Sequence, residues 1–277
     1  MIGSVFRLLD SNLSTGANDM DTEFLKARYQ MAIEIEKEVG AFLLSHENLR
    51  HDIKQKATND FVTVADQKAE DMIEEKIKEL FPQDSILGEE NGVIASKSSN
   101  RWIIDPIDGT VDFMASFPNY TISIAFEDED GIAFGVVYVV RQGELFSAFR
   151  GEGAYLNGKR FYTDEETPLD KQLAILVPPH RRHEHIDSFM VTMRKFYEYV
   201  SDLRSVGSAA CSLCYVAIGR VALYYERALK VYDVAAGMFI VKEAGGKVTL
   251  LSDDENWIDI VASSSFCHEK VLEIIND

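Results

Sequence analysis

Cysteine is scarce in this chain, since only Cys211, Cys214 and Cys267 occur among 277 residues. So few cysteines, in an odd number, argue against a disulfide scaffold. Cys211 and Cys214 have the Cys-x-x-Cys spacing of some redox and metal pairs, but no second pair accompanies them and their flanks predict a buried helix. We therefore expect all three residues to be small apolar members of the core.

Long apolar runs are also missing from the sequence. No stretch approaches the roughly 20 apolar residues that a membrane-spanning helix needs. The apolar patch at residues 5–9 is short and contains Arg7, which does not suit the core of a secretion signal. We expect residues 1–20 to form a flexible leader and the protein to be cytoplasmic.

Positive charge is in short supply. The chain has 28 lysine and arginine residues against 46 aspartate and glutamate residues, which gives a net charge of −18. Such a surface repels nucleic-acid backbones and anionic membranes, so we expect neither as a direct partner. An anionic substrate would need bridging cations, which favours a metal site. The 46% hydrophobic content is enough for a substantial core.

The hydrophobic pattern predicts helices and strands without an internal repeat. Helical periodicity follows a candidate N-cap at Asp21 and continues to residue 43, with Arg28 as the only polar residue on its apolar side. A second helix is expected over residues 66–80 and is stopped by Pro82. The strands expected next cover residues 103–104, 120–126, 133–140 and 145–149, followed by a hairpin turn at Asn157-Gly158.

A polar stretch at residues 163–170 is the expected boundary between two halves, residues 21–165 and residues 166–277. Strands and helices alternate in the second half, and Gly245-Gly246 predicts the end of a helix. The mixture indicates an α/β or α+β fold of layered sheets and helices. The second-half helices are expected at 186–199, 209–218, 231–244 and from 267 onward, and the strands at 173–177, 221–225 and near 248 and 260.

The hexapeptide Asp105-Pro-Ile-Asp108-Gly109-Thr110 carries the strongest chemical signal. Its two carboxylates follow the apolar run Trp102-Ile-Ile, which predicts a strand end and a buried Trp102. The layout places two oxygen ligands at a sheet edge, beside backbone N–H groups suited to a phosphate. Two such aspartates taken alone are more often turn formers or caps, but the whole hexapeptide predicts metal-dependent chemistry on phosphate esters.

Three more acidic motifs lie far from the hexapeptide in the sequence. They are residues 60–66, which end in Asp66, the turn Gly88-Glu89-Glu90-Asn91, and Tyr232-Asp233 at the start of a predicted helix. With these motifs the chain resembles the inositol monophosphatase family, among the lithium-sensitive, magnesium-dependent sugar phosphatases. The resemblance covers roughly Phe24 to the C-terminus and also rests on Gly151–Tyr155, Arg204–Ala210 and Tyr224–Glu226.

The resemblance implies a layered αβαβα sandwich, like that of inositol monophosphatase and fructose-1,6-bisphosphatase, and a homodimer. It implies a phosphatase that acts on inositol monophosphate or a related sugar or polyol phosphate through water activated by two or three Mg²⁺ ions. The implied ligands of one ion are Glu89, Asp105 and the Ile107 carbonyl. Those of a second ion are Asp105, Asp108 and Asp233, and a weaker third ion would bind Glu89 and water.

Catalytic and substrate-binding roles follow from the same resemblance. Thr110 and Glu89 would orient the attacking water, and Asp66 would hold the Thr110 hydroxyl. The N–H groups of Gly109 and Thr110 would bind the phosphate. The residues implied around the alcohol part of the substrate are Asp108, Gly207, Ser208, Ala209, Glu226 and Asp233.

Several alternatives remain open from the sequence. Asp66 and Asp233 are each also placed to cap a helix. The run from His180 to His185 is interpreted as a polar surface loop, or as a border of the pocket entrance. Asp112 stands where close relatives often have asparagine, so the substrate is open. Alternatives are fructose 1,6-bisphosphate, a nucleotide 3′-phosphate and histidinol phosphate, and a different class of function is a regulatory protein-binding role.

Overall fold

The structure, a computed structural model, describes residues 19–57, 60–252, 254 and 256–277. The leader expected at residues 1–20 falls almost wholly outside these ranges. Its last two residues are already helical, since the first helix begins at Asp19, ahead of the N-cap expected at Asp21. No helix in the described part of the chain is long and apolar enough to cross a membrane.

The regular elements follow the alternation expected from the hydrophobic pattern. The α-helices are α2 (Asp19–Ser45), α3 (Val64–Leu80), α4 (Thr110–Met114), α5 (Ile186–Tyr197), α6 (Ala209–Ala217), α7 (Val231–Glu243) and α8 (His268–Asn276). Short 3-10 helices are η1 (Glu47–His51), η2 (Val140–Gln142), η3 (Leu169–Lys171) and η4 (His183–His185). A separate antiparallel hairpin joins β1 (Ile53–Ala57) and β2 (Asp60–Thr63).

The remaining strands form two sheets. The larger sheet has the order β10-β9-β8-β7-β6-β5-β3-β4, and the smaller has the order β12-β11-β13-β15-β14. The larger contains β3 (Ser85–Gly88), β4 (Val93–Ile94), β5 (Arg101–Asp108), β6 (Thr121–Asp128), β7 (Gly131–Val139), β8 (Glu144–Phe149), β9 (Gly153–Leu156) and β10 (Lys159–Phe161). The smaller contains β11 (Leu173–Leu176), β12 (Asp202–Arg204), β13 (Leu223–Leu229), β14 (Lys247–Leu250) and β15 (Ile258–Ser263).

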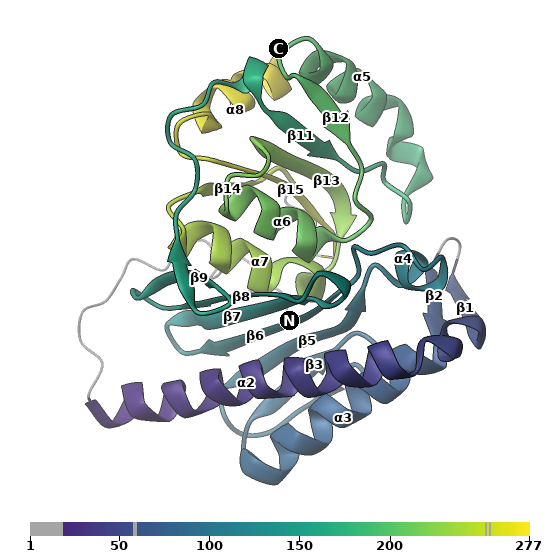
Figure 1. The fold of residues 1–277 in the computed structure, drawn as a ribbon, viewed down its shortest axis with the longest axis vertical. Helices are drawn as coiled ribbons and strands as arrows, with labels where there is room; N and C mark the ends of the chain where they lie inside the picture. Colours follow the sequence, from purple (N-terminus) through teal and green to yellow (C-terminus); the bar gives the residue numbers. More distant parts are fainter. Residues whose placement is uncertain (1–18, 58–59, 253, 255) are drawn as a thin grey trace.

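Helices and sheets alternate in five layers (Figure 1). α2 and α3 cover one face of the larger sheet, and α6 and α7 fill the space between the two sheets. α5 and α8 cover the outer face of the smaller sheet. The predicted αβαβα sandwich is thereby confirmed. The larger sheet lies within residues 85–161 and the smaller within 173–263, while the division into two halves stays a prediction.

The outer core explains the polar break in α2. The Arg28 guanidinium is buried and pairs with Asp84, with Nε 2.8 Å from Oδ2. Trp102, which is fully buried as expected, donates its indole N–H to the same oxygen at 3.0 Å. Phe24, in the second turn of α2, and Leu80, the last residue of α3, have the spacing of the apolar side, but their side chains are exposed.

The central layer fixes α7 against the larger sheet. α6 and α7 are apolar on nearly all sides because both of their faces are covered by a sheet. A Cβ on Gly135 of β7 would lie only 2.8 Å from the Ala236 carbonyl oxygen, so glycine permits this close approach. Cys211 and Cys214 are buried in this layer and Cys267 beneath α8, which confirms the expected core role of the three free thiols.

Candidate active site

A β-bulge in β5 brings the two aspartates of the hexapeptide together. Asp105 pairs with Ser123 and Asp108 with Thr121, so three steps along β5 match two steps along β6. In a regular strand, residues three apart point to opposite faces. The extra residue of the bulge turns Asp105 and Asp108 to the same side. The bulge therefore accounts for the three-residue spacing of the two carboxylates.

A cluster of three carboxylates lies beside this bulge. Asp105, Asp108 and Asp233 each offer an oxygen within 4.8 Å of the others, and all three residues are buried. Burial, followed by the charge of the Asp233 carboxylate, raises the pKa of Asp108 to about 7. Burial, followed by the charges of Glu89 and the other two aspartates, raises the pKa of Asp105 well above its usual range.

The donor set of this cluster fits a hard divalent cation. Asp105 Oδ1 accepts the Ile107 N–H at 3.2 Å, but the buried Asp105 Oδ2 has no hydrogen-bond partner among the described residues. A buried carboxylate oxygen without a partner is costly. Oxygen-only ligands of this kind suit Mg²⁺, and Ile107 lines the same pocket.

Asp108 is held from the other half of the chain, at the start of α6. Its Oδ2 accepts from the Ser208 hydroxyl at 2.6 Å and from the Ala210 N–H at 2.7 Å. Ser208 is also the N-cap of α6, because its Oγ accepts from the Cys211 N–H at 3.1 Å. These contacts fix Asp108 through uncharged donors and tie β5 to α6.

The turn after β3 places Glu89 at the edge of the pocket. Burial raises the pKa of Glu89 to about 8. Glu70 of α3 fixes the turn, because its carboxylate accepts the N–H groups of Glu90 at 2.9 Å and Asn91 at 2.7 Å. A Cβ at Gly88 would clash with this carboxylate, so glycine leaves the space that the Glu70 side chain occupies. Glu70 was not predicted from the sequence, where its only signal is an acidic residue four positions after Asp66, on the buried side of α3.

Asp66 has both of the roles considered for it. The Thr110 hydroxyl donates to Asp66 Oδ1 at 3.0 Å. The other oxygen of Asp66 accepts the Thr63 N–H at 2.8 Å, and the Thr63 hydroxyl in turn accepts the Ala65 N–H at 3.1 Å. This capping box begins α3 and leaves Asp66 fully buried behind Thr110.

Two glycines let the chain pass closely over the hexapeptide. Gly109 has φ 94°, and a Cβ there would lie 3.2 Å from the Gly207 carbonyl oxygen. Gly207 has φ 83°, and its Cβ would lie 2.7 Å from a carboxylate oxygen of Asp112. Burial raises the pKa of Asp112 to about 6. Asp112, the departure from the family pattern, therefore sits against the segment that leads to Ser208.

A second β-bulge, in β13, forms the opposite wall of the pocket. Glu226 pairs with Ile260 and Leu229 with Ile258, so this strand also carries one extra residue. The extra residue turns both Glu226 and Leu229 toward the pocket, which they line. Glu226 is buried, which raises its pKa to about 8, and it accepts the Tyr224 hydroxyl at 2.5 Å.

Asp233 lies in the first turn of α7 and also has two roles. Its Oδ2 accepts the Lys230 N–H at 2.6 Å, which is a capping contact at the helix start. The same carboxylate forms an ion pair with Arg181, with Nη1 2.6 Å from Oδ2. His180 Nδ1 lies 3.8 Å from a Glu226 oxygen. His180 and Arg181 border the pocket, which is one of the two interpretations given for the run from His180 to His185.

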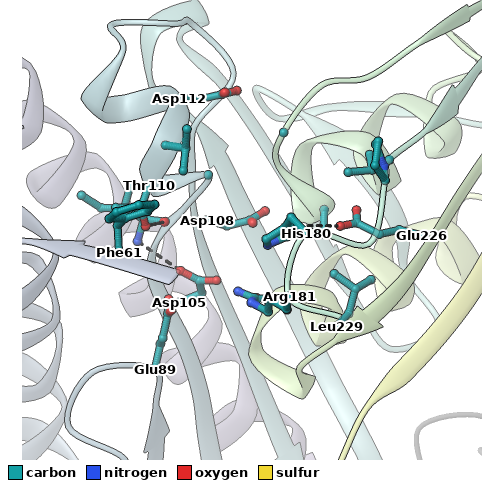
Figure 2. Close-up of a pocket in the computed structure, with 18 residues that line it drawn as sticks. Phe61, Glu89, Asp105, Asp108, Thr110, Asp112, His180, Arg181, Glu226 and Leu229 are labelled. Atoms are coloured by element: carbon teal, nitrogen blue, oxygen red, sulfur yellow. Dashed lines mark hydrogen bonds and ion pairs between the residues drawn. The ribbon is translucent and has the colours of Figure 1, made fainter. Parts of the chain in front are cut away.

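The pocket is a cavity of about 420 Å³ between two walls (Figure 2). We call Glu89, Asp105 and Thr110 the first wall, and His180, Arg181, Glu226 and Leu229 the second wall; Asp108 points between them. Asp66 and Ser208 do not line the cavity but bond to Thr110 and Asp108, respectively, from behind. The other predicted site residues that line it are Ile107, Gly109, Gly207, Ala209 and Asp233.

The sequence of this chain is similar to those of known proteins. A family model described as the inositol monophosphatase family matches residues 25–277. Nus factor SuhB of Vibrio cholerae is 38% identical over 80% of this chain and 85% of its own length. An inositol-1-monophosphatase of Mesorhizobium japonicum is 34% identical over the same shares.

Solved structures show the same fold. The extragenic suppressor protein SuhB of Bartonella henselae matches with a TM-score of 0.85 at 30% identity, over 91% of this chain and 99% of that one. A crystal structure of SaIMPase-II with bound inositol monophosphate matches with a TM-score of 0.74 at 27% identity, over 91% of this chain and 93% of that one.

Proposed function

Because this chain belongs to the inositol monophosphatase family, we propose that it is a magnesium-dependent phosphomonoester hydrolase for inositol monophosphate or a related sugar or polyol phosphate. The observation that carries the proposal is the cluster of Asp105, Asp108 and Asp233, in which the buried Oδ2 of Asp105 has no hydrogen-bond partner among the described residues. The names of the Mesorhizobium relative and of the SaIMPase-II complex support the substrate class.

The proposed site would supply ligands for two ions, and a weaker third ion would bind Glu89 and water. Glu89, Asp105 and the Ile107 carbonyl would hold one ion. Asp105, Asp108 and Asp233 would hold a second. When bound, the ions would lower the pKa of a water molecule and stabilise charge on the phosphate and the leaving oxygen.

The residues of the first wall would position the reactants. Asp66 accepts the hydroxyl proton of Thr110 at 3.0 Å, which leaves the lone pairs of Thr110 Oγ1 free to accept a hydrogen bond from the attacking water. Glu89 would accept the other proton of that water. The N–H groups of Gly109 and Thr110 would bind the phosphate, where glycine permits close approach.

The second wall would hold the alcohol part of the substrate. Glu226 is fixed by Tyr224 and would bond to ring hydroxyls, as would Asp233 and Asp108. Gly207 and Ala209 would form the floor at the start of α6. Leu229 adds an apolar surface that would pack against the ring carbons.

A substrate panel with purified protein and Mg²⁺ tests the proposal. It compares inositol 1-phosphate with fructose 1,6-bisphosphate, a nucleotide 3′-phosphate and histidinol phosphate. We expect phosphate release from inositol 1-phosphate, and Asp105→Asn should abolish it while the fold is retained. Asp202→Asn, an exposed aspartate in β12, is the matched control with unchanged activity. Near-normal turnover by Asp105→Asn would refute the metal assignment, and release from the bisphosphate alone would redirect the substrate assignment.

A regulatory role through protein binding is a second candidate. It is favoured by the name Nus factor SuhB, which several relatives at 36–38% identity carry. A chromosomal Asp105→Asn replacement separates the two functions. If that strain grows like the deletion strain, the enzymatic role is the one the cell needs; if it grows like wild type, the binding role is. The expected homodimer and the absence of direct nucleic-acid contacts stay predictions.

A further inference from the structure

Arg181 is the one side chain of the second wall that places a permanent positive charge against the acidic cluster. It donates from Nη1 to Asp233 Oδ2 at 2.6 Å, and Nη2 lies 3.4 Å from Oδ1. We propose that Arg181 is a built-in counter-cation of Asp233 that has to give way to the divalent ion, and that it thereby sets the affinity of the site for that ion. The inference rests on the proposed function, because it takes Asp233 as a ligand.

The hydrogen bonds of Asp233 carry the first step of the argument. Its Oδ2 already accepts two short bonds, from the Lys230 N–H and from Arg181, both at 2.6 Å. Oδ1 remains as the ligand atom, and the second nitrogen of Arg181 lies close to it. An ion on Oδ1 would therefore meet the guanidinium at short range, and two cations at that range repel each other strongly.

The surroundings keep this guanidinium charged and inside the site. The Arg181 side chain is only 16% exposed. A guanidinium stays protonated in proteins, and this one pairs with the Asp233 carboxylate. Figure 2 shows Arg181 extending from the second wall toward Asp105. Its charge thus partly neutralises the same carboxylates that a divalent ion would neutralise.

The neighbouring backbone is anchored, so an exchange needs only the side chain to move. The Arg182 N–H donates to the Pro179 carbonyl at 3.2 Å, and the Arg182 guanidinium pairs with Glu184 and Asp254. Arg181 therefore extends from a hydrogen-bonded turn between β11 and α5. Arg182 also supplies a matched control, since its ion pairs lie on the surface away from the acidic cluster.

Binding of Mn²⁺, measured by calorimetry and by the loss of its free-ion EPR signal, tests the inference. Arg181→Gln should bind Mn²⁺ about tenfold more tightly than wild type, because a charge-assisted hydrogen bond no longer competes. Arg181→Lys, which keeps the charge but not the paired donors, should fall between the two. Arg182→Gln should bind like wild type. Equal or weaker Mn²⁺ binding by Arg181→Gln would overturn the inference and make Arg181 a support for the ligand.

Urea unfolding gives a second test, because replacing a purely structural residue would lower the stability equally with and without Mg²⁺. In EDTA, Arg181→Gln should unfold at a lower urea concentration than wild type, because the carboxylates lose their counter-cation. Saturating Mg²⁺ should raise its midpoint by more than it raises that of wild type. Equal losses with and without Mg²⁺ would refute the exchange. Asp105→Asn separates failure of this inference from failure of the proposed metal site. If this variant binds Mn²⁺ as tightly as wild type does, the proposed metal site itself is wrong.

Discussion

Two β-bulges shape the pocket, and they are built in different ways. The bulge of β5 contains Pro106, which has no backbone N–H that would need a partner. The bulge of β13 contains Ala228 at φ 65°, a conformation that L-residues with a side chain rarely adopt. Its N–H is accepted by Asp259 of β15 at 2.9 Å. The first bulge is therefore encoded within one short motif, whereas the second depends on another strand.

Four buried carboxylates in and behind the pocket also differ in the groups that hold them. Asp66 and Asp108 accept hydrogen bonds from hydroxyl and N–H groups that carry no charge. Asp233 and Glu226 instead face Arg181 and His180. We therefore expect Asp66 and Asp108 to keep their positions when charges change, whereas Glu89 of the first wall has a charged partner in Lys56, 3.4 Å away. The second wall should respond to pH and to ion binding.

The largest effect is expected on the first wall, from Thr110→Ala. Loss of the hydroxyl that Asp66 holds should lower kcat for phosphate release by about 100-fold or more, with little change in stability. Thr110→Ser keeps the hydroxyl and should retain most of the activity. Near-normal turnover by the alanine variant would show that this hydroxyl does not orient the reacting water.

The second bulge is broken by Asp259→Ala. The change leaves the Ala228 N–H without its acceptor and removes the ion pair of Arg227, which keeps only its bond to the Ser188 hydroxyl. It should cost about 3 kcal/mol in the free energy of unfolding. KM should rise as well, because Glu226 shares this bulge. Asp202→Ala, which removes an exposed ion pair with Arg204, should cost less than about 0.5 kcal/mol in urea unfolding. Equal costs for the two variants would mean that Asp259 does not hold the bulge.

Glu226→Gln tests whether the second wall responds to pH, through the pH dependence of the free energy of unfolding. Burial raises the folded-state pKa of Glu226 to about 8, above its unfolded value of about 4.3. The stability that this group contributes is therefore complete below pH 4.3 and is lost as pH rises through 8, by up to about 1.4 kcal/mol per pH unit. In EDTA, urea unfolding of Glu226→Gln should show a flatter profile than wild type between pH 5 and 8. Parallel profiles would contradict the raised pKa.

The smallest effect is expected from Ala228→Gly. Glycine adopts φ 65° without strain, but it adds freedom to the unfolded chain and removes a buried methyl group. The relief of backbone strain nearly cancels the loss from the added chain freedom and the missing methyl group, so the free energy of unfolding should change by less than about 1 kcal/mol. A thermal or urea midpoint that falls well beyond this would show that methyl packing outweighs backbone strain at the bulge.

Local sequence was sufficient where a motif contains its own geometry. The hexapeptide predicted a carboxylate pair at a strand end, and Asn157-Gly158 predicted the hairpin turn that joins β9 and β10. The buried thiols and Trp102 followed from apolar surroundings along the chain. Sequence was insufficient for Glu70 and Asp259, because each holds a backbone segment that belongs to a different element.

The sequence by itself determined the layered fold class, the family and the acidic motifs, because apolar periodicity and short-range spacing are written along the chain. Only the tertiary structure decided that Arg181 pairs with Asp233 and that Glu226 turns into the pocket beside Leu229. The reason is physical: a charged side chain takes its partner from whatever lies within a few ångströms once the core has packed, and Arg181 and Asp233 are 52 positions apart.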